Sequence, residues 1–226
     1  MRVGVKLILV AAVLTAAGVV IGFYVSHLTT LAGSPAYSVP VENVNGHPVV
    51  NLQIQTVAAV GPKLSPNPDW VSYLIKDAGG QWRRETVWDL PAHATVHVTI
   101  YNFDGASGLR NPYLARPQGM VGNRIVVDGK PTTAIDPNDA SHTFAVPQLG
   151  LIVAIPGVAD DAKNQCGFAP CPMTTAHRTI RFTFHTTTPG HYRWQCFVPC
   201  AAGWIDGFGG PMQTIGYMDG FLNVKA

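Results

Sequence analysis

The clearest candidates for chemistry in this sequence are its four cysteines, which fall in two closely spaced pairs. Cys166 and Cys171 form one pair, and Cys196 and Cys200 form the other. Thiolate sulfur suits copper, above all beside imidazole or thioether groups, whereas two cysteines whose Cα atoms lie about 5 Å apart can bond to each other. The spacing therefore leaves a metal site and disulfide bonds open for both pairs.

An imidazole that could join the second pair is that of His142. Side chains alternate between the two faces of a strand, so Cys196 shares a face with Trp194 in the expected strand 191–196. By the same rule, His142 shares a face with Phe144 and points into an apolar interior. A buried imidazole near a thiolate has the geometry of a metal ligand, although a hydrogen-bonded core histidine is the alternative.

Short β-strands are the elements that must position these groups. Residues 95–101 and 179–185 alternate apolar and polar side chains, which is typical of half-buried strands. The 23 Gly and 18 Pro residues supply turns between such runs. The pattern predicts an all-β sandwich or barrel. Further strands are expected at 49–60, 124–127, 142–146, 151–155, 191–196 and 220–224.

The N-terminal segment 7–25 is apolar and uncharged. About 20 such residues are needed for a helix to cross a bilayer. Arg2 and Lys6 precede the segment, and no Lys or Arg follows until Lys63, so the positive-inside rule places the N-terminus in the cytoplasm. The segment predicts a single-pass helix in the cell membrane, with the C-terminal domain extracytoplasmic.

A cleaved signal peptide is the alternative for this segment, and both alternatives export the rest of the chain. The expected organisation is an anchor or signal peptide at 1–28, a linker at 29–40 and an extracytoplasmic domain at 41–226. Only 12% of residues are charged and the net charge is +2, without a basic stripe, so a nucleic-acid partner is not expected.

Two segments resemble a known family. Residues 141–157 read S-H-T-F-A-V-P-Q-L-G-L-I-V-A-I-P-G, and residues 188–204 read T-P-G-H-Y-R-W-Q-C-F-V-P-C-A-A-G-W. They resemble the CuA domain of cytochrome c oxidase subunit II, and a weaker likeness reaches back to residues 90–105. The resemblance implies a cupredoxin-like Greek-key β-sandwich.

The resemblance also implies a metal-ligand set. Carried over position by position, it consists of His142, Cys196, Cys200 and Met212. The loop is degenerate, because Trp204 stands where the family has a second histidine, and Met212 lies eight residues beyond it instead of three. One copper ion is therefore expected instead of two, and a copper-free site is the alternative.

The function implied by the resemblance is electron transfer. The chain would be a non-catalytic subunit of an oxidoreductase similar to cytochrome c oxidase, tethered by its helix to a haem-copper catalytic subunit or another redox partner. Two alternatives are a copper-free structural subunit of a quinol-type oxidase and a free-standing membrane-tethered cupredoxin. Trp194 and Trp204 are expected near the surface where electrons enter.

Three further expectations concern Asp206 and the two cysteine pairs. Asp206 could replace the missing histidine, although carboxylate is a harder ligand than copper(I) prefers. Cys196 and Cys200 could form a disulfide in place of a copper site. Cys166 and Cys171 have no counterpart in the family, and a local disulfide is expected for them ahead of a second metal site.

Overall fold

The fold is taken from a computed structural model, which describes residues 3–32, 36–200 and 210–226. The chain divides into two compact units, Met1–Ser34 and Pro35–Ala226. The first contains helix α1 (Val3–Ala32), whose segment Gly4–Ser26 has a mean hydropathy of 2.5. This helix is long and apolar enough to be a membrane anchor, and a signal sequence would share those features.

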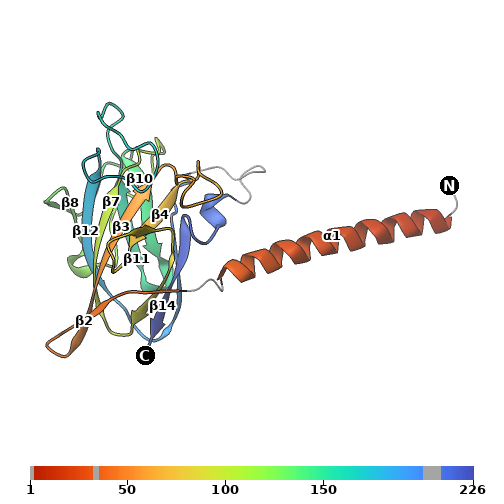
Figure 1. Ribbon diagram of the computed structural model, residues 1–226, viewed down its shortest axis with the longest axis horizontal. Helices are drawn as coiled ribbons and strands as arrows, with labels where there is room; N and C mark the ends of the chain where they lie inside the picture. Colours follow the sequence, from red (N-terminus) through yellow and green to blue (C-terminus); the bar gives the residue numbers. More distant parts are fainter. Residues whose placement is uncertain (1–2, 33–35, 201–209) are drawn as a thin grey trace. The chain divides into compact units, whose positions relative to one another are not determined.

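The second unit is mostly β-structure in two sheets (Figure 1). The six-stranded sheet has the order β1 (Tyr37–Ser38), β6 (Val87–Pro91), β14 (Asp219–Lys225), β13 (Gly190–Gln195), β10 (Ala140–Val146), β11 (Leu151–Pro156). The eight-stranded sheet has the order β5 (Trp82–Arg83), β4 (Ser72–Lys76), β3 (His47–Val57), β7 (Thr95–Asn102), β12 (Arg178–His185), β8 (Ile125–Val127), β9 (Lys130–Thr132), with β2 (Val41–Val44) paired to β3. Three short 3-10 helices complete the unit: η1 (Val121–Asn123), η2 (Pro147–Leu149) and η3 (Pro211–Gln213).

Strands β7 and β12 confirm the alternation predicted for them. They pair antiparallel, and Ile180 lies opposite Ile100 and Phe182 opposite Val98. All four side chains are buried, whereas the polar residues between them are exposed or half-buried. Because one core cluster contains residues of both sheets, the alternating apolar face is what joins the sheets.

The centre of this core is aromatic. Trp194 of β13 is fully buried, lies 5.2 Å from the ring of Trp88 and 4.9 Å from that of Tyr73, and donates from Nε1 to the carbonyl oxygen of Thr86 at 3.0 Å. The expectation that Trp194 lies near the surface is therefore wrong. Its face of β13 is the inner one, which it shares with Cys196.

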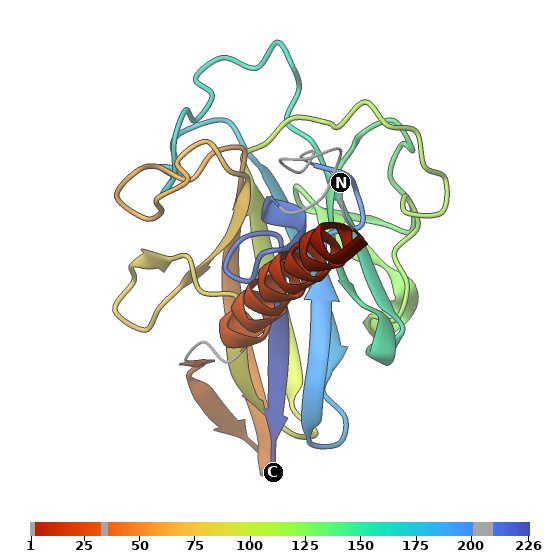
Figure 2. The same ribbon diagram turned by 90° about the vertical axis from the view of Figure 1, so that its right-hand side faces the viewer.

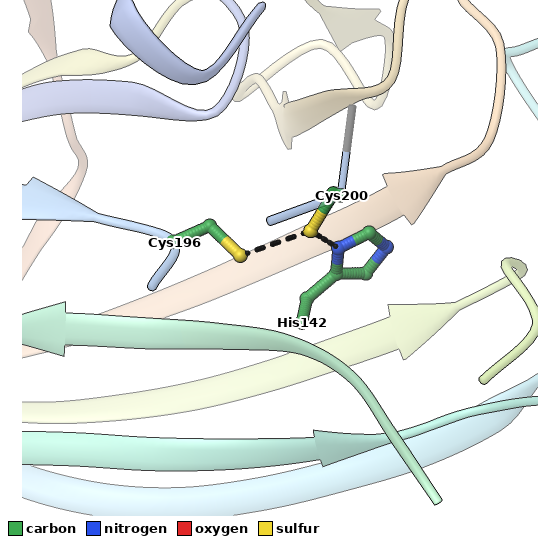
Figure 3. Close-up of side chains that lie close together, drawn as sticks. All are labelled: His142, Cys196 and Cys200. Carbon is green, nitrogen blue, oxygen red and sulfur yellow. Dashed lines mark hydrogen bonds between the residues drawn. The ribbon is translucent and has the colours of Figure 1, made fainter. Parts of the chain in front are cut away.

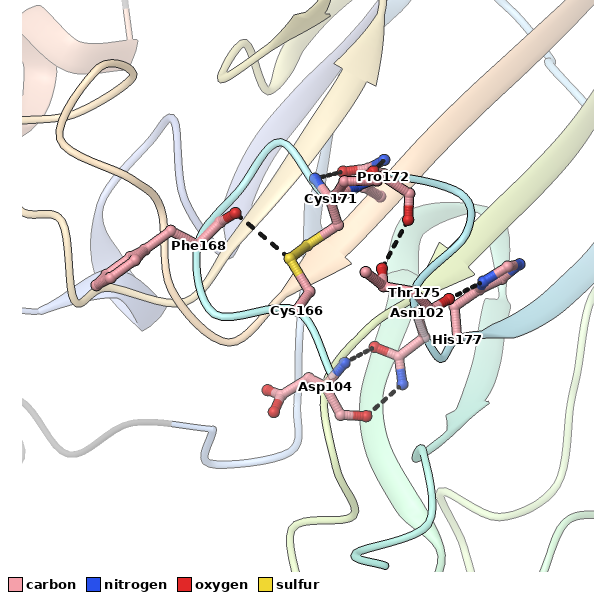
Figure 4. The surroundings of a disulfide bond; sticks show 9 residues. Asn102, Asp104, Cys166, Phe168, Cys171, Pro172, Thr175 and His177 are labelled. Atoms are coloured by element: carbon pink, nitrogen blue, oxygen red, sulfur yellow. Dashed lines mark hydrogen bonds between the residues drawn. A yellow bond between two sulfur atoms is a disulfide. The ribbon is translucent and has the colours of Figure 1, made fainter. Parts of the chain in front are cut away.

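Long loops follow β7 and β11, and both lie at the end of the sheets away from the C-terminus (Figures 1 and 2). The loop after β11 contains a disulfide bond between Cys166 and Cys171, which confirms that prediction (Figure 4). Cys171 is buried, and its backbone N–H and carbonyl both bond to the side chain of Gln55 on β3, at 3.0 and 2.8 Å. The loop is thereby fixed to the eight-stranded sheet.

Replacing both Cys166 and Cys171 with serine is expected to lower the free energy of unfolding by about 2 kcal/mol, the chain-entropy value for so short a loop. Equilibrium urea unfolding of the full chain in neutral detergent, followed by circular dichroism, measures the change. An unchanged unfolding midpoint would show that the loop is held by Gln55 and its apolar contacts alone.

Candidate metal centre

Three potential ligand atoms converge at the loop-bearing end of the six-stranded sheet (Figure 3). Nδ1 of His142 lies 2.9 Å from Sγ of Cys200, and the sulfurs of Cys196 and Cys200 are 3.2 Å apart. The ligand atoms all lie within 4.8 Å of one another, so one ion could contact all three. Both cysteines are free, so the structure does not contain the alternative disulfide between them.

The pairing of β10 with β13 explains why the three groups meet. Ala145 lies opposite Gln195, so His142 and Cys196 sit at the same end of adjacent antiparallel strands. The backbone N–H of Thr143 donates to Sγ of Cys196 at 3.3 Å, and its hydroxyl accepts from the N–H of Phe197 at 2.7 Å. These contacts fix the Cys196 sulfur just after its strand ends.

The chain then turns back so that Cys200 reaches the same place. The Cys200 N–H donates to the carbonyl oxygen of Val198 at 2.7 Å, and that oxygen lies 3.0 Å from Sγ of Cys200 and 3.4 Å from Sγ of Cys196. His142 and Cys196 are only 1% and 3% exposed, whereas Cys200 is half-buried. The site is therefore shielded from water except on the side of Cys200.

Asp104 is a site residue that the sequence did not reveal. Its Oδ2 lies 3.1 Å from Nε2 of His142, so the carboxylate forms an ion pair with the imidazole when the imidazole is protonated. Asn102, at the end of β7, accepts from the N–H of Asp104 at 3.2 Å and donates to the carbonyl oxygen of Pro156 at 2.8 Å. Figure 4 shows the contacts of Asn102 with Asp104. Asn102 thus ties the turn that carries Asp104 to the end of β11, where Ile155 pairs with His142.

The charges of these groups depend on one another. Burial lowers the pKa of His142, but the Asp104 carboxylate and the Cys196 thiolate outweigh burial and raise that pKa to about 9. Burial raises the pKa of Cys196, but hydrogen bonds from Cys200 and His142 hold it well below its usual value. The pKa of Cys200 is raised by its hydrogen bond to Cys196 and then by burial. These shifts favour an ion pair between a Cys196 thiolate and a His142 imidazolium, with the Cys200 proton held more tightly, and a bound cation would displace protons from the ligand atoms.

Three other residues that the sequence pointed to near this site are Met212, Trp204 and Asp206. Met212, in η3, is half-buried and packs against the core cluster that contains Cys196. The N–H of Met218 donates to the carbonyl oxygen of Pro211, and its own carbonyl accepts from the N–H of Cys196, both at 3.1 Å, so η3 and the site are linked through the backbone. Trp204 and Asp206 lie outside the described residues.

This donor set fits copper. Two sulfurs and an imidazole nitrogen are the soft ligands of copper electron-transfer sites, and a carboxylate on the second ring nitrogen is the usual partner of a metal-binding histidine. His142, Cys196 and Cys200 would hold the ion, and Asp104 would orient the imidazole so that Nδ1 faces the sulfurs.

Asp104→Asn is expected to weaken copper binding by about 10- to 100-fold, because the carboxylate that orients and polarises His142 is lost while its shape is kept. Competition against a copper chelator measures the affinity. The matched control is Asp161→Asn, which removes the same charge at an exposed position of another loop. Equal affinities of the two variants would exclude this role for Asp104.

Comparisons with known proteins give little further information. No protein-family model and no curated protein matches the chain. Among solved structures, a point mutant of rusticyanin, a cupredoxin, matches over 89% of this chain and 94% of its own, with 15% sequence identity and a TM-score of 0.33. A likeness at these values determines neither the fold nor the function of this chain.

Proposed function

We propose that this chain is a membrane-anchored cupredoxin whose exported domain transfers electrons through one copper ion. The observation that carries the proposal is the convergence of Nδ1 of His142 with the sulfurs of Cys196 and Cys200. Copper bound to these groups would supply a one-electron change of oxidation state.

The protein's part in electron transfer would be to keep the ligands in place when the charge changes. His142 and Cys196 are held by adjacent strands, Thr143 fixes the Cys196 sulfur, and Asp104 holds the imidazole. Ligands that cannot move, inside an apolar shell, keep the cost of reorganisation low. In this proposal Met212 would be a further, weak sulfur ligand to the ion.

The positions of the two motifs support a subunit of the cytochrome c oxidase subunit II type. Residues 141–157 include most of β10 together with η2 and β11, and the described residues 188–200 include β13 and both free cysteines, so motifs far apart in sequence meet at one site. We propose that helix α1 anchors the domain to the cell membrane, on the extracytoplasmic side, beside a haem-copper catalytic subunit or another redox partner. The sandwich would then be a Greek-key cupredoxin.

Reversible bleaching tests the proposal. The full chain, purified in neutral detergent and loaded with copper(II), should show a visible sulfur-to-copper absorption band that ascorbate removes and ferricyanide restores. If copper-replete protein has no such band and both thiols remain titratable, the electron-transfer proposal fails and a copper-free structural subunit is favoured.

A further inference from the structure

A second site lies on the outer face of the eight-stranded sheet, where β7, β12 and β8 run side by side (Figure 1). A cleft of about 370 Å³ is lined there by residues of these strands and of the segment just before β8. Its charged and polar side chains are those of His97, Thr99, Arg124, Arg181 and Thr183. No acidic residue lines it.

The two arginines of this cleft differ from three others in the domain, and among the described residues they share their lack of an ion pair with the exposed Arg110 and Arg116, which do not line the cleft. Arg83, Arg178 and Arg193 each form an ion pair with an aspartate. Arg124 and Arg181 form none within the described part of the chain, although both are exposed and line one cleft. Two positive charges thus line one cleft whose described residues include no carboxylate, so an anion in this cleft would meet a positive potential.

Strand register builds the rest of the cleft. Arg181 pairs with Thr99 on one side and with Val126 on the other, and Thr183 pairs with His97. Nδ1 of His97 lies 2.9 Å from the Thr183 hydroxyl, which fixes the imidazole between the strands. The backbones of His97, Thr99, Arg181 and Thr183 are thus held by paired strands, and Arg124 lies just before β8.

We propose that this cleft binds a phosphate group. A guanidinium matches the oxygens of phosphate or carboxylate in a two-pronged contact. Two guanidinium groups, an imidazole and a Thr99 hydroxyl offer more donors than the two oxygens of one carboxylate accept, whereas a phosphate monoester presents three terminal oxygens. The group could belong to a soluble phosphate compound or to a phospholipid head group. The site is independent of the proposed copper function.

The test uses the full chain in neutral detergent at low ionic strength, since salt screens exposed charges. Inorganic phosphate is titrated while the arginine Nε–H signals are followed by nuclear magnetic resonance. Saturable shifts of the Arg124 and Arg181 signals are expected, and binding should weaken by about tenfold or more in the Arg124→Gln/Arg181→Gln double variant. The matched control is Arg110→Gln/Arg116→Gln, which removes the same charge from exposed positions elsewhere and should bind as the parent does.

A parallel titration with short-chain phosphatidic acid, whose head group is a phosphate monoester, and with phosphatidylcholine as the control, distinguishes the two sources. Tighter binding of phosphatidic acid than of phosphate assigns the site to a lipid head group, and the reverse assigns it to a soluble phosphate compound. The proposal is overturned if neither ligand shifts the two signals, or if the control pair weakens binding as much as the cleft pair does.

Discussion

Cys196→Ser is expected to abolish the visible absorption of the copper-loaded protein and to weaken copper binding by at least about 100-fold, more than the loss of a second-sphere partner. Cys196 is 3% exposed, its sulfur accepts a hydrogen bond from the N–H of Thr143, and the pKa of its thiol is lowered, so it is the thiol best prepared to bind a cation. A hydroxyl of similar size keeps the packing but is a much harder and weaker donor to copper.

Absorption spectroscopy and chelator competition measure these two effects. The control is the Cys166→Ser/Cys171→Ser variant, which removes two sulfurs from the disulfide loop and should keep the band. Circular dichroism of both variants shows whether each is folded. A folded Cys196→Ser protein that retains the full band would remove Cys196 from the ligand set.

Trp194→Ala is expected to lower the free energy of unfolding by about 3–5 kcal/mol. The indole is fully buried, lies between the rings of Trp88 and Tyr73, and donates a hydrogen bond to Thr86. Alanine leaves a cavity at this point and removes one of the two hydrogen bonds to the Thr86 carbonyl, which keeps only the one from the N–H of Phe221. The loss is larger than that of the disulfide because the cavity lies in the centre of the core.

Urea unfolding followed by circular dichroism gives the size of this effect. Trp194→Phe keeps most of the apolar volume and should cost less than the alanine variant, whereas Tyr113→Ala, at a side chain that is 62% exposed, should change little. Because Cys196 follows Trp194 by two residues on the same face of the strand, Trp194→Ala should also weaken copper binding. A loss of less than about 1 kcal/mol would contradict the central role given to this residue.

The alternation of apolar and polar residues predicted the strands that have one buried and one solvent-exposed face. It did not predict strands that are buried on both faces. Strand β4 reads S-Y-L-I-K and is buried on both faces for most of its length, so its apolar run carries no period of two. Strand β1 has only two residues and lies inside the segment expected to be a linker, yet it pairs with β6. Such elements are defined by their neighbours in the sheet more than by their own sequence.

The candidate site shows the same limit. His142, Cys196 and Cys200 could be selected because their types and motifs are unusual, and the structure brings them together. Asp104 could not, since an aspartate before a glycine in a turn is common and its role depends on Asn102 binding the end of β11. Trp194 was expected near the surface because electrons were expected to enter there. Its position on the same strand face as Cys196 already indicated that it is buried.

Copper quantification combined with electron paramagnetic resonance on the full chain tests the central claim most directly. The account predicts one copper per chain, with the hyperfine pattern of a single copper nucleus and loss of the signal in His142→Ala. A mixed-valence signal from two coppers would contradict the single-ion site. Protein that was supplied with excess copper and bound none would contradict the metal centre itself.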